Sequence, residues 1–379
     1  MDIQTHSLEL TDSTKRPNQN FTAFVLQQKI FKRSSIGLMF LDKESLNFNE
    51  KTNHGFTNYN RNIGIEYNLA TASNLWTGKA MVMKSFSPNK SGNDVMQAYK
   101  LSYAALHWNI NLQYENVGQN YNPEIGYVPR RGYYRISSPN IYYAFYPKKE
   151  SSGTFYQAPT YLFDYYWNSN GELTDAVNTF QYFLYRKSLS YLEVYFKTNF
   201  YKLQYDFDPT NKISNDVLKA GSEYRFNTVG VNYSSSPRKK YTIRFNGEYG
   251  GYFGEGKLSD LTFTIGYRFQ PYVNFLASIS NVDINEVKVP IERKPDKIVN
   301  SNFWLVSPKV DITFSNKLFW TTFVQYNEQT QNVNINSRFQ WRYQPASDIF
   351  LVYTDNYLPG SLTIKNRAIV LKWTYWWNL

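Results

Sequence analysis

The sequence predicts an all-β protein, a transmembrane antiparallel β-barrel of about 16 strands, within a range of about 14 to 18. Three observations indicate this fold class. Aromatic residues make up 18% of the 379 residues, yet the mean hydropathy is -0.54. Apolar and polar side chains alternate along many segments, and none of these holds the about 18 uninterrupted apolar residues of a transmembrane helix. A barrel explains the mixture, because one face of each strand meets lipid and the other meets a polar lumen.

The amino-terminal residues 1–20 are predicted to be a polar lead-in or the remnant of a linker, and residues 21–379 to form the barrel. The first twelve residues lack the apolar core of a secretory signal. We therefore expect such a signal to have been removed or to lie upstream. The absence of cysteine excludes thiolate metal sites and cysteine nucleophiles.

Alternation with a period of two locates the clearest strands. In residues 108–115, aromatic or aliphatic side chains occupy every even position, and Asn, Gln or Glu occupies every odd position. Similar alternation marks residues 62–69, 201–208, 241–249, 261–270 and 333–343. This period is that of a β-strand, and segments of about 8 to 13 residues match a tilted strand that crosses a bilayer.

Two aromatic segments carry predictions of their own. Residues 369–379 place Ile, Leu, Trp and Tyr on one face. We expect the last strand to continue to Leu379 and to end in an aromatic girdle at the membrane surface. Residues 161–167 are predicted to be an aromatic loop, whose rings either stack on sugars or lie at headgroup level as part of such a girdle.

The predicted connections alternate between short and long. Residues 315–317 form a short turn, whereas residues 46–60, 148–153 and 283–296 form longer loops. Barrels show this alternation because their periplasmic turns are brief and their external loops are larger. The spacing of these connections is the basis for the predicted number of strands.

Residues 121–134 contain two prolines and two glycines. Proline removes a backbone donor from the ladder, so we expect this segment to form a shaped loop between strands. The loop either folds inward and contacts a ligand or forms a rigid structure at the rim. Its candidate site residues are Asn122, Pro123, Glu124, Pro129, Arg130 and Arg131.

The net charge of +11 arises from 41 Lys and Arg against 30 Asp and Glu, which are scattered along the chain with only short clusters such as residues 238–240. This scatter argues against a nucleic-acid-binding groove, so no nucleic-acid partner is expected. The expected partners are outer-membrane lipid and lipopolysaccharide, whose anionic headgroups would meet Lys and Arg at the rim. Glycans and other outer-membrane proteins are further candidate partners.

Charged residues on the polar faces of the predicted strands are candidates for lining the lumen. They are Arg225, Arg244, Arg268, Arg338, Arg342, Glu115, Glu193 and Glu248. Rings of arginine would favour anions in an open pore, whereas networks of paired side chains would fill the lumen of a closed anchor. Two carboxylates about 5 to 10 Å apart would instead meet the requirement of a glycosidase.

The sequence assigns no catalytic residue, metal site or cofactor. It contains no HExxH or GxSxG motif, which removes the strongest hydrolase signatures. The histidines His6, His54 and His107 lie far apart in the sequence, which argues against a metal site built from them.

Three stretches of the chain carry a family resemblance. They are NPEIGYVPRRG at 122–132, WRYQP at 341–345 with SDIFLVY at 347–353, and NRAIVLKWTY at 366–375. In order and spacing they resemble a Gram-negative outer-membrane β-barrel family of unassigned function, which usually follows a module similar to family-9 carbohydrate-binding domains. The resemblance implies a membrane barrel. Too few residues precede the first predicted strand to hold that module, so a glycan-related function is implied only by association.

Three functional hypotheses follow, each from a different class. The first is an integral barrel of the bacterial outer membrane that acts as a membrane anchor, partner-binding scaffold or pore. The second is a glycan-acting hydrolase built on a barrel, and the third is a soluble all-β carbohydrate-binding protein. Dependence on detergent separates the third from the others, because a soluble protein would bury its Tyr, Phe and Trp side chains.

Overall fold

The computed structural model describes residues 2–5, 16–88, 90–210, 217–291, 294–361 and 363–377. In these ranges the protein is all-β, with twenty strands and one short 3-10 helix. The elements are β1 Asp2–Thr5, β2 Asn18–Ile30, β3 Ser34–Leu46, β4 Tyr59–Ala70, β5 Trp76–Phe86, β6 Val95–Ala104, β7 Trp108–Val117, β8 Tyr133–Tyr143, β9 Thr154–Asn168, β10 Leu173–Arg186, β11 Tyr191–Lys202, β12 Glu223–Ser234, β13 Tyr241–Gly251, η1 Phe253–Glu255, β14 Lys257–Phe269, β15 Val273–Val289, β16 Lys297–Thr313, β17 Leu318–Asn327, β18 Asn332–Gln344, β19 Ser347–Tyr357 and β20 Ile364–Trp373. No helix in these ranges is long and apolar enough to span a membrane.

The strands form one antiparallel sheet in which sequence neighbours lie side by side. Antiparallel registers join β1 to β2. They also join consecutive strands from β2 through β9, and consecutive strands from β11 through β20. The pairings described for these residues include none that closes the sheet, so closure into a barrel stays a prediction.

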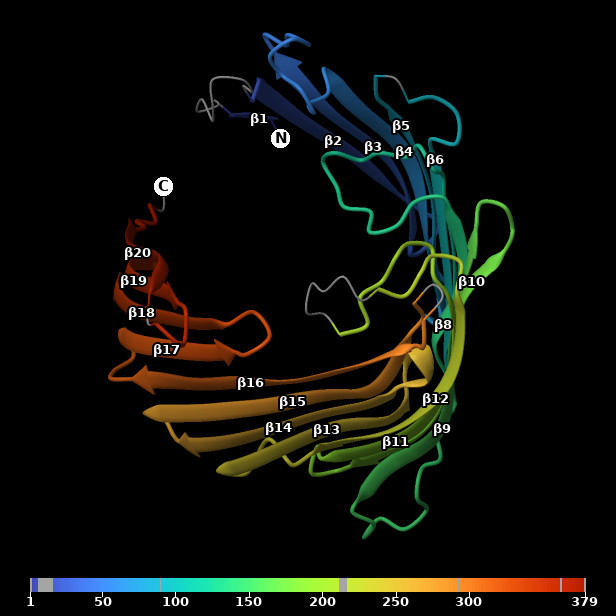
Figure 1. Ribbon diagram of the computed structural model, residues 1–379. Coiled ribbons are helices and arrows are strands. Elements are labelled where there is room, and N and C mark those ends of the chain that lie inside the picture. Colours follow the sequence, from blue (N-terminus) through green and yellow to red (C-terminus); the bar gives the residue numbers. More distant parts are fainter. Residues whose placement is uncertain are drawn as a thin grey trace. The chain divides into compact units, whose positions relative to one another are not determined.

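The chain forms two compact units. Unit 1 comprises residues 1–144 and 160–178, and unit 2 comprises residues 145–159 and 179–379. Strands β1 to β8 belong to unit 1 and β11 to β20 to unit 2, while β9 and β10 contribute a part to each (Figure 1). Successive connections within a unit lie at opposite ends of its strands, because neighbouring strands are antiparallel. We call the end of a unit at which the even-numbered strands finish its short-turn end. The end at which the odd-numbered strands finish is its long-loop end.

In unit 2 the two faces of the sheet differ in chemistry. Residues paired across strands share a face. One face carries rows of apolar residues such as Val231, Gly247 and Leu261, and the opposite face carries polar residues such as Glu248 and Asp260. The apolar side chains are exposed, since Val231 is 37% and Leu261 42% accessible. We call these the apolar face and the polar face.

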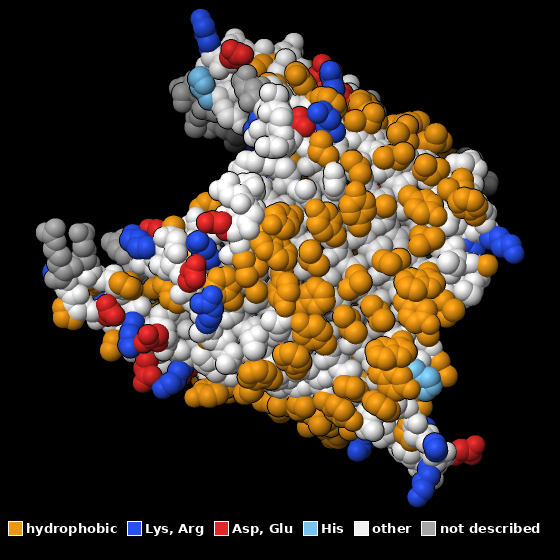
Figure 2. Space-filling view, turned by 90° about the vertical axis from the view of Figure 1, so that its right-hand side faces the viewer, with side chains coloured by type: hydrophobic (Ala, Val, Ile, Leu, Met, Phe, Trp, Pro, Cys, Tyr) orange, Lys and Arg blue, Asp and Glu red, His pale blue; other side chains and the backbone are white. Residues whose placement is uncertain are grey.

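Unit 1 has the same two faces. On its apolar face, Leu38, Ile65 and Val82 pair across β3, β4 and β5, and Leu38 and Ile65 are 43% and 50% exposed. Figure 2 shows hydrophobic side chains spread over one face of the molecule with few charged side chains among them. A soluble sheet would bury such a face under a second layer. The described residues supply no layer that covers these side chains.

Buried apolar residues form two small clusters, one in each unit. The cluster of unit 1 consists of Met83, Val117, Tyr121 and Tyr133. The cluster of unit 2 consists of Leu218, Ile284, Val287 and Val289. Each cluster includes a residue from a long connection, Tyr121 or Leu218, that packs against strands. The buried apolar packing therefore lies between a loop and the sheet in each unit.

The number of strands exceeds the prediction. Twenty strands occur in the described ranges, against a predicted range of about 14 to 18. Register irregularities occur where β8 pairs with β7 and with β9, and where β15 pairs with β16.

The predicted lead-in is described only in part. Residues 2–5 form β1 and pair with β2, which begins at Asn18, before the predicted boundary at residue 21. Residues 6–15, with His6, lie outside the described residues. The lead-in therefore stays a prediction.

Four predicted boundaries are wrong. Residues 201–208 are not one strand, because β11 ends at Lys202 and the alternating apolar residues beyond it pack inside a loop. Residues 161–167 belong to β9, where rings on both faces hide the alternation. Residues 283–289 belong to β15, whose Asn and Asp side chains are typical of loops. At the carboxyl end, β20 stops at Trp373, and residues 374–377 are not in a strand.

Candidate functional site

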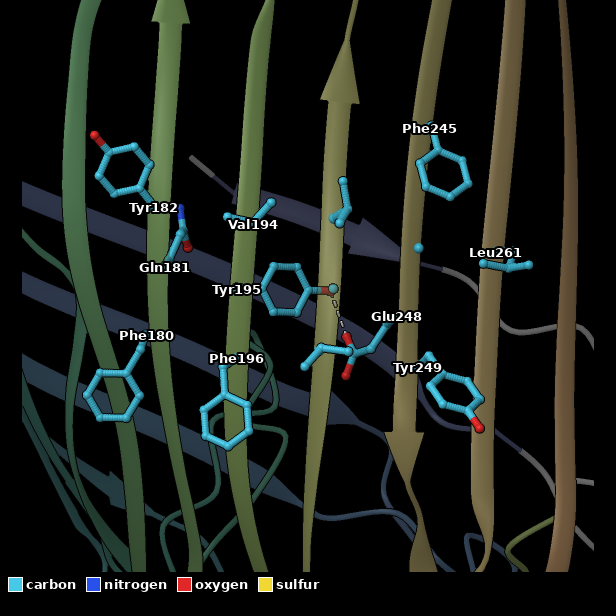
Figure 3. Close-up of a pocket in the computed structure, with 14 residues that line it drawn as sticks. Phe180, Gln181, Tyr182, Val194, Tyr195, Phe196, Phe245, Glu248, Tyr249 and Leu261 are labelled. Atoms are coloured by element: carbon cyan, nitrogen blue, oxygen red, sulfur yellow. Dashed lines mark hydrogen bonds between the residues drawn. The ribbon is translucent and has the colours of Figure 1, made fainter.

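The polar face of unit 2 contains a charged cluster centred on Glu248 of β13. Its Oε2 accepts hydrogen bonds from the Tyr195 hydroxyl at 2.9 Å and from Lys197 Nζ at 2.6 Å, both on β11. Its Oε1 accepts a hydrogen bond from Thr228 Oγ1 of β12 at 2.8 Å. Figure 3 shows the Tyr195 side chain directed at Glu248 across the strand between them. Three donors from two strands thus hold this carboxylate in place.

Gly230 makes the contact between Tyr195 and Glu248 possible. It pairs with Tyr195 on one side and with Glu248 on the other. A Cβ atom at Gly230 would lie 2.0 Å from Tyr195 Cζ, so any side chain there would displace the ring. The ring instead covers the bare glycine, a packing that helps fix strand register.

A hollow of about 710 Å³ lies on the apolar face of unit 2 near the same strands. Phe245, Tyr249 and Leu261 stand around it (Figure 3), and Gly247 and Val231 also line it. Most of its walls are apolar, although Gln181, Tyr195 and Glu248 also border it. The hollow therefore offers a ligand few hydrogen-bonding groups.

Arg135 of β8 joins two carboxylates on the polar face of unit 1. Its Nε donates to Asp164 Oδ1 at 2.6 Å and its Nη2 to Oδ2 at 2.9 Å. Its Nη1 lies 3.5 Å from Glu115 Oε1, and the Tyr133 hydroxyl donates to Glu115 Oε2 at 3.0 Å. A bidentate pair fixes the plane of the guanidinium group. Glu115, a predicted lumen residue, is thus a member of a fixed network.

The β7–β8 loop, residues 118–132, folds onto the polar face of β3, β4 and β5. Lys43 Nζ of β3 lies 2.5 Å from Glu124 Oε2, and the Lys43 side chain is 7% exposed. Thr57 Oγ1 lies 2.9 Å from both carboxylate oxygens of Glu124. The Glu124 backbone N–H donates to Asn60 Oδ1 at 3.0 Å. An almost buried ion pair therefore anchors this loop.

Asn122 provides the second anchor of the β7–β8 loop. Its backbone N–H donates to Ser85 Oγ at 2.9 Å, and its carbonyl accepts from Asn60 Nδ2 at 2.6 Å. Its side-chain oxygen accepts a hydrogen bond from Arg131 Nη2 at 2.7 Å. These contacts satisfy the polar groups of the loop where it covers β4 and β5.

The β7–β8 loop has a fixed base and an exposed tip. Arg130 Nη1 donates to Asp175 Oδ2 at 2.7 Å, and its guanidinium carbon lies 4.7 Å from the Tyr166 ring centre. Tyr121 is 1% exposed, and burial raises the pKa of its hydroxyl group. Tyr127 is 86% exposed. The loop thus presents an aromatic ring on a rigid support.

All six residues predicted for the loop site lie in this one loop. Four of them anchor it through their side chains: Asn122, Glu124, Arg130 and Arg131. Pro123 shapes a turn, since its carbonyl accepts a hydrogen bond from the Gly126 N–H at 3.0 Å. Pro129 is exposed. The segment lies on the polar face, which corresponds to the inward alternative if that face lines a lumen.

Most predicted lumen residues of unit 2 lie on its polar face. They are Glu193, Arg244, Glu248, Arg268, Arg338 and Arg342. Glu193 accepts a hydrogen bond from Asn232 Nδ2 at 2.8 Å, and Arg342 Nε donates to Asp348 Oδ1 at 3.3 Å. Arg244 makes no ion pair among the described residues. Arg244 is therefore an unpaired charge on the polar face, within the described residues.

Arg225 is on the other face, contrary to its predicted orientation. It pairs with Phe200, and its guanidinium carbon lies 4.5 Å from the centre of the Phe200 ring. Arg225 and the exposed apolar residue Val229 are four positions apart in β12, so both belong to the apolar face. Arg225 stands near the long-loop end of its strand, where a charged side chain reaches beyond the apolar rows.

The β11–β12 loop, described at residues 203–210 and 217–222, was not predicted from the sequence. Its two arms pair through Phe207 and Leu218, whose N–H groups each donate to the other's carbonyl at 2.9 and 2.8 Å. Leu218 is fully buried and packs with the unit 2 cluster on the polar face of β14 and β15. A signal was present, because Asp208 precedes a proline and caps Thr210 N–H at 2.8 Å in a turn.

An exposed ionic contact lies on the surface of the β11–β12 loop. Lys219 Nζ lies 2.7 Å from Asp206 Oδ2, and both side chains are well exposed. The hydrogen bond from Lys219, with a second from the Ala220 N–H, lowers the pKa of Asp206. Such an exposed pair adds little stability. The apolar cluster beneath it is the main anchor of the loop.

The predicted glutamates do not gather into one site. Glu115 belongs to unit 1, and Glu193 and Glu248 have separate partners in unit 2. The carboxylate in register beside Glu248 is Asp260 of β14. Within the described ranges, no group of three His, Cys, Asp or Glu side chains could hold a metal ion. We therefore assign no catalytic or metal-binding role to these residues.

Comparison of the sequence with protein-family models and with curated proteins found no match. The family resemblance of the three sequence stretches thus stays a prediction. The two faces of the sheet and the two infolded loops are the features from which a function can be inferred.

Proposed function

We propose that the chain is an integral β-barrel of the bacterial outer membrane that acts as a narrow pore for small polar solutes. The apolar face would contact lipid, and the polar face would surround the lumen. The observation that carries this proposal is the exposed apolar face, which repeats on consecutive strands in both units. Exposure of these side chains is unfavourable in water and favourable in hydrocarbon.

The length of the apolar face supports a membrane crossing. On β14, exposed apolar side chains occupy alternate positions from Leu261 to Phe269. Eight residue steps extend about 27 Å along a strand. A strand tilted by about 40° would cross about 21 Å, close to the about 25 Å apolar band of such barrels.

The apolar rows of unit 2 also have borders of the expected kind. Toward the short-turn end, the Tyr241 and Tyr267 rings lie 5.0 Å apart, as in the aromatic belts of membrane proteins. Toward the long-loop end, amides replace apolar residues on the same face. Asn281 Nδ2 donates to Asn302 Oδ1 at 3.2 Å, and Asn302 Nδ2 donates to Asp283 Oδ1 at 3.1 Å. The hydrocarbon layer would therefore extend between these two zones and end at each of them.

The infolded loops support a narrow lumen. The β7–β8 loop covers part of the polar face of unit 1, and the β11–β12 loop covers part of that of unit 2. Many polar side chains on the same faces are bonded to one another. These mutual hydrogen bonds favour a second candidate function, a closed membrane anchor. Polar groups that already bond to one another do not require water or a solute as a partner.

Refolding the purified chain into phosphatidylcholine vesicles tests the barrel. We expect protease-resistant insertion and a folded form that migrates differently from the boiled form in dodecyl sulfate gels, because a closed strand wall resists the detergent. A chain that stays monodisperse without detergent and does not enter vesicles would contradict the barrel and favour a soluble protein.

Conductance in a planar bilayer separates the pore from the anchor. We expect steady small openings, with an anion preference that falls about twofold in Arg244→Gln, because this side chain is on the polar face and unpaired among the described residues. Arg225→Gln is the matched control, since Arg225 is on the apolar face. Insertion without conductance would contradict the pore and leave the anchor.

A further inference from the structure

The short-turn end of unit 2 is strongly basic. Its connections contain seven Lys or Arg and a single acidic residue, Glu150, in residues 145–153, 187–190, 235–240, 270–272, 314–317 and 345–346. At the long-loop end, the described connections of unit 2 contain two Lys and five Asp or Glu. Positive charge in these connections is therefore concentrated at one end of the strands.

A hollow of about 580 Å³ lies at this basic end. It is formed by the β16–β17 turn and the β18–β19 turn, with Lys317, Arg342 and Pro345 among its walls. The Arg342 N–H donates to the Lys317 carbonyl at 2.8 Å, which joins the two turns. Both cationic side chains are thus attached to a fixed backbone at the border of the hollow.

The two cations have unused hydrogen-bond donors. The Lys317 side chain makes no ion pair among the described residues. Arg342 donates from Nε to Asp348 Oδ1 at 3.3 Å, and that oxygen is shared with Gln340 Nε2 at 2.9 Å. The terminal amino groups of Arg342 donate to no acceptor within the described ranges. A lysine ammonium and an arginine fork are the groups that bind phosphate oxygens in proteins.

Aromatic residues beside the hollow lie where a membrane surface would be. Tyr343 lines the hollow, and its hydroxyl accepts a hydrogen bond from Trp373 Nε1 at 2.7 Å and donates to the Thr374 carbonyl at 3.0 Å. The Trp341 ring centre is 6.1 Å from that of Tyr343. Tyrosine and tryptophan with one apolar and one polar side are typical of headgroup depth.

We propose that this hollow binds the phosphate group of an anionic membrane lipid in the leaflet that contacts the short turns. The inference rests on the proposed membrane location. Lys317 would hold the phosphate oxygens from the β16–β17 turn, and the free amino groups of Arg342 would reach them around the end of β18, because its Nε pairs with Asp348 on the polar face. Tyr343 and Trp373 would contact the glycerol and upper acyl carbons. The surrounding basic turns would raise the local concentration of anionic headgroups.

Lipid competition tests the site. The chain is reconstituted with phosphatidylcholine and phosphatidylglycerol, each in turn with brominated acyl chains, and quenching of tryptophan fluorescence gives their relative affinities. We expect the wild-type protein to favour phosphatidylglycerol about fivefold, and Lys317→Gln with Arg342→Gln to reduce this preference to less than about twofold. An unchanged preference in the double variant would overturn the proposal.

Lys365→Gln is the matched control. This lysine is also exposed in unit 2, but its Nζ donates to the Gln331 carbonyl at 3.2 Å at the long-loop end. Its loss should leave the lipid preference unchanged. Arg342→Lys should retain part of the preference, because a charge remains without the fork. An equal loss of the lipid preference in Lys365→Gln would show that removal of any positive charge lowers it. That result would overturn the proposed site.

Three further outcomes separate the inference from the proposed function. If Lys317→Gln with Arg342→Gln weakens binding of inorganic phosphate but leaves the lipid preference unchanged, the ligand is a soluble phosphate and the lipid assignment is wrong. If the wild-type chain inserts into vesicles but shows equal quenching by both lipids, the inference fails and the barrel stands. If the chain does not insert at all, both fail.

Discussion

The β7–β8 loop and the β11–β12 loop both cover the polar face of their own unit, but different forces hold them. In the first, the Lys43–Glu124 pair and the amides of Asn60 and Asn122 form directional contacts in a nearly dry site. In the second, Leu218 is fully buried in an apolar cluster, and the ionic contact lies on the surface. The polar loop depends on matched partners, whereas the apolar loop depends on volume and area.

This difference predicts how each loop tolerates change. Removing one partner of a buried pair leaves the other charge desolvated and unpaired, so a single change is costly. An apolar cluster accepts another apolar side chain of similar volume but not a polar one. Loss of a charged partner should therefore release the β7–β8 loop. A polar substitution in the apolar cluster should release the β11–β12 loop.

Leu218→Asp should have the largest effect, because it puts a carboxylate into a fully buried apolar cluster. We expect the free energy of unfolding to fall by about 4 kcal/mol or more. Protease cleavage within residues 203–210 of the detergent-solubilised protein measures release of the loop. Leu218→Met is the control and should cost less than about 1.5 kcal/mol. A loop that stays protected in Leu218→Asp would show that packing does not hold it.

Lys43→Met should release the β7–β8 loop at a cost of about 3 kcal/mol, since Glu124 loses its cation in a site where Lys43 is only 7% exposed. Hydrogen exchange of residues 121–132 reports the release. Lys51→Met, in the exposed β3–β4 connection, should change nothing. Adding Glu124→Gln to Lys43→Met should restore part of the stability, because the unpaired charge is gone. Strict additivity of the two changes would contradict the pair.

Thr57→Val should cost less, about 1 to 2 kcal/mol, because it removes one hydroxyl from Glu124 but leaves the ion pair. Denaturant unfolding measured beside Lys43→Met gives the ratio of the two losses. Thr52→Val serves as the control, since the Thr52 hydroxyl is 3.5 Å from its acceptor in an exposed turn. Equal losses for Thr57 and Thr52 would mean that the Glu124 site contributes nothing specific.

Added salt should have the smallest effect, but it should change the hydrogen exchange of the two loops differently. In 1 M salt the Debye length is about 3 Å, so the Lys43–Glu124 attraction is weakened slightly through the 22% exposed Glu124 side chain, while apolar packing is not weakened. We expect exchange of residues 121–132 to rise by about two- to threefold and exchange of residues 203–210 to stay constant or fall. The same response in both loops would remove the distinction between them.

Unbroken alternation made part of the fold predictable. Residues 241–249 and 261–270 correspond to β13 and β14, because each side chain there lies on either the apolar or the polar face of the sheet. Residues 201–208 show the same period, yet Leu203 and Phe207 pack under a loop. An extended loop arm that buries alternate residues has the periodicity of a strand. Local spacing cannot separate these two cases.

The site was less predictable than the fold because its contacts join distant segments. Proline and glycine indicated the β7–β8 loop, but nothing in the sequence pairs Glu124 with Lys43, 81 residues away. Arg225 was assigned to the lumen by its charge alone. Its register beside Phe200 shows that a charged residue near the end of a strand can belong to the apolar face.

The amide network of Asn281, Asp283 and Asn302 has a mechanical consequence. It lies on β15 and β16, each 17 residues long, where both faces of the ladder are polar or packed by the β11–β12 loop. If the chain spans a membrane as proposed, this part of the hairpin would stand in water beyond the hydrocarbon border. A large molecule approaching from that side would then meet these polar side chains before it reached the bilayer.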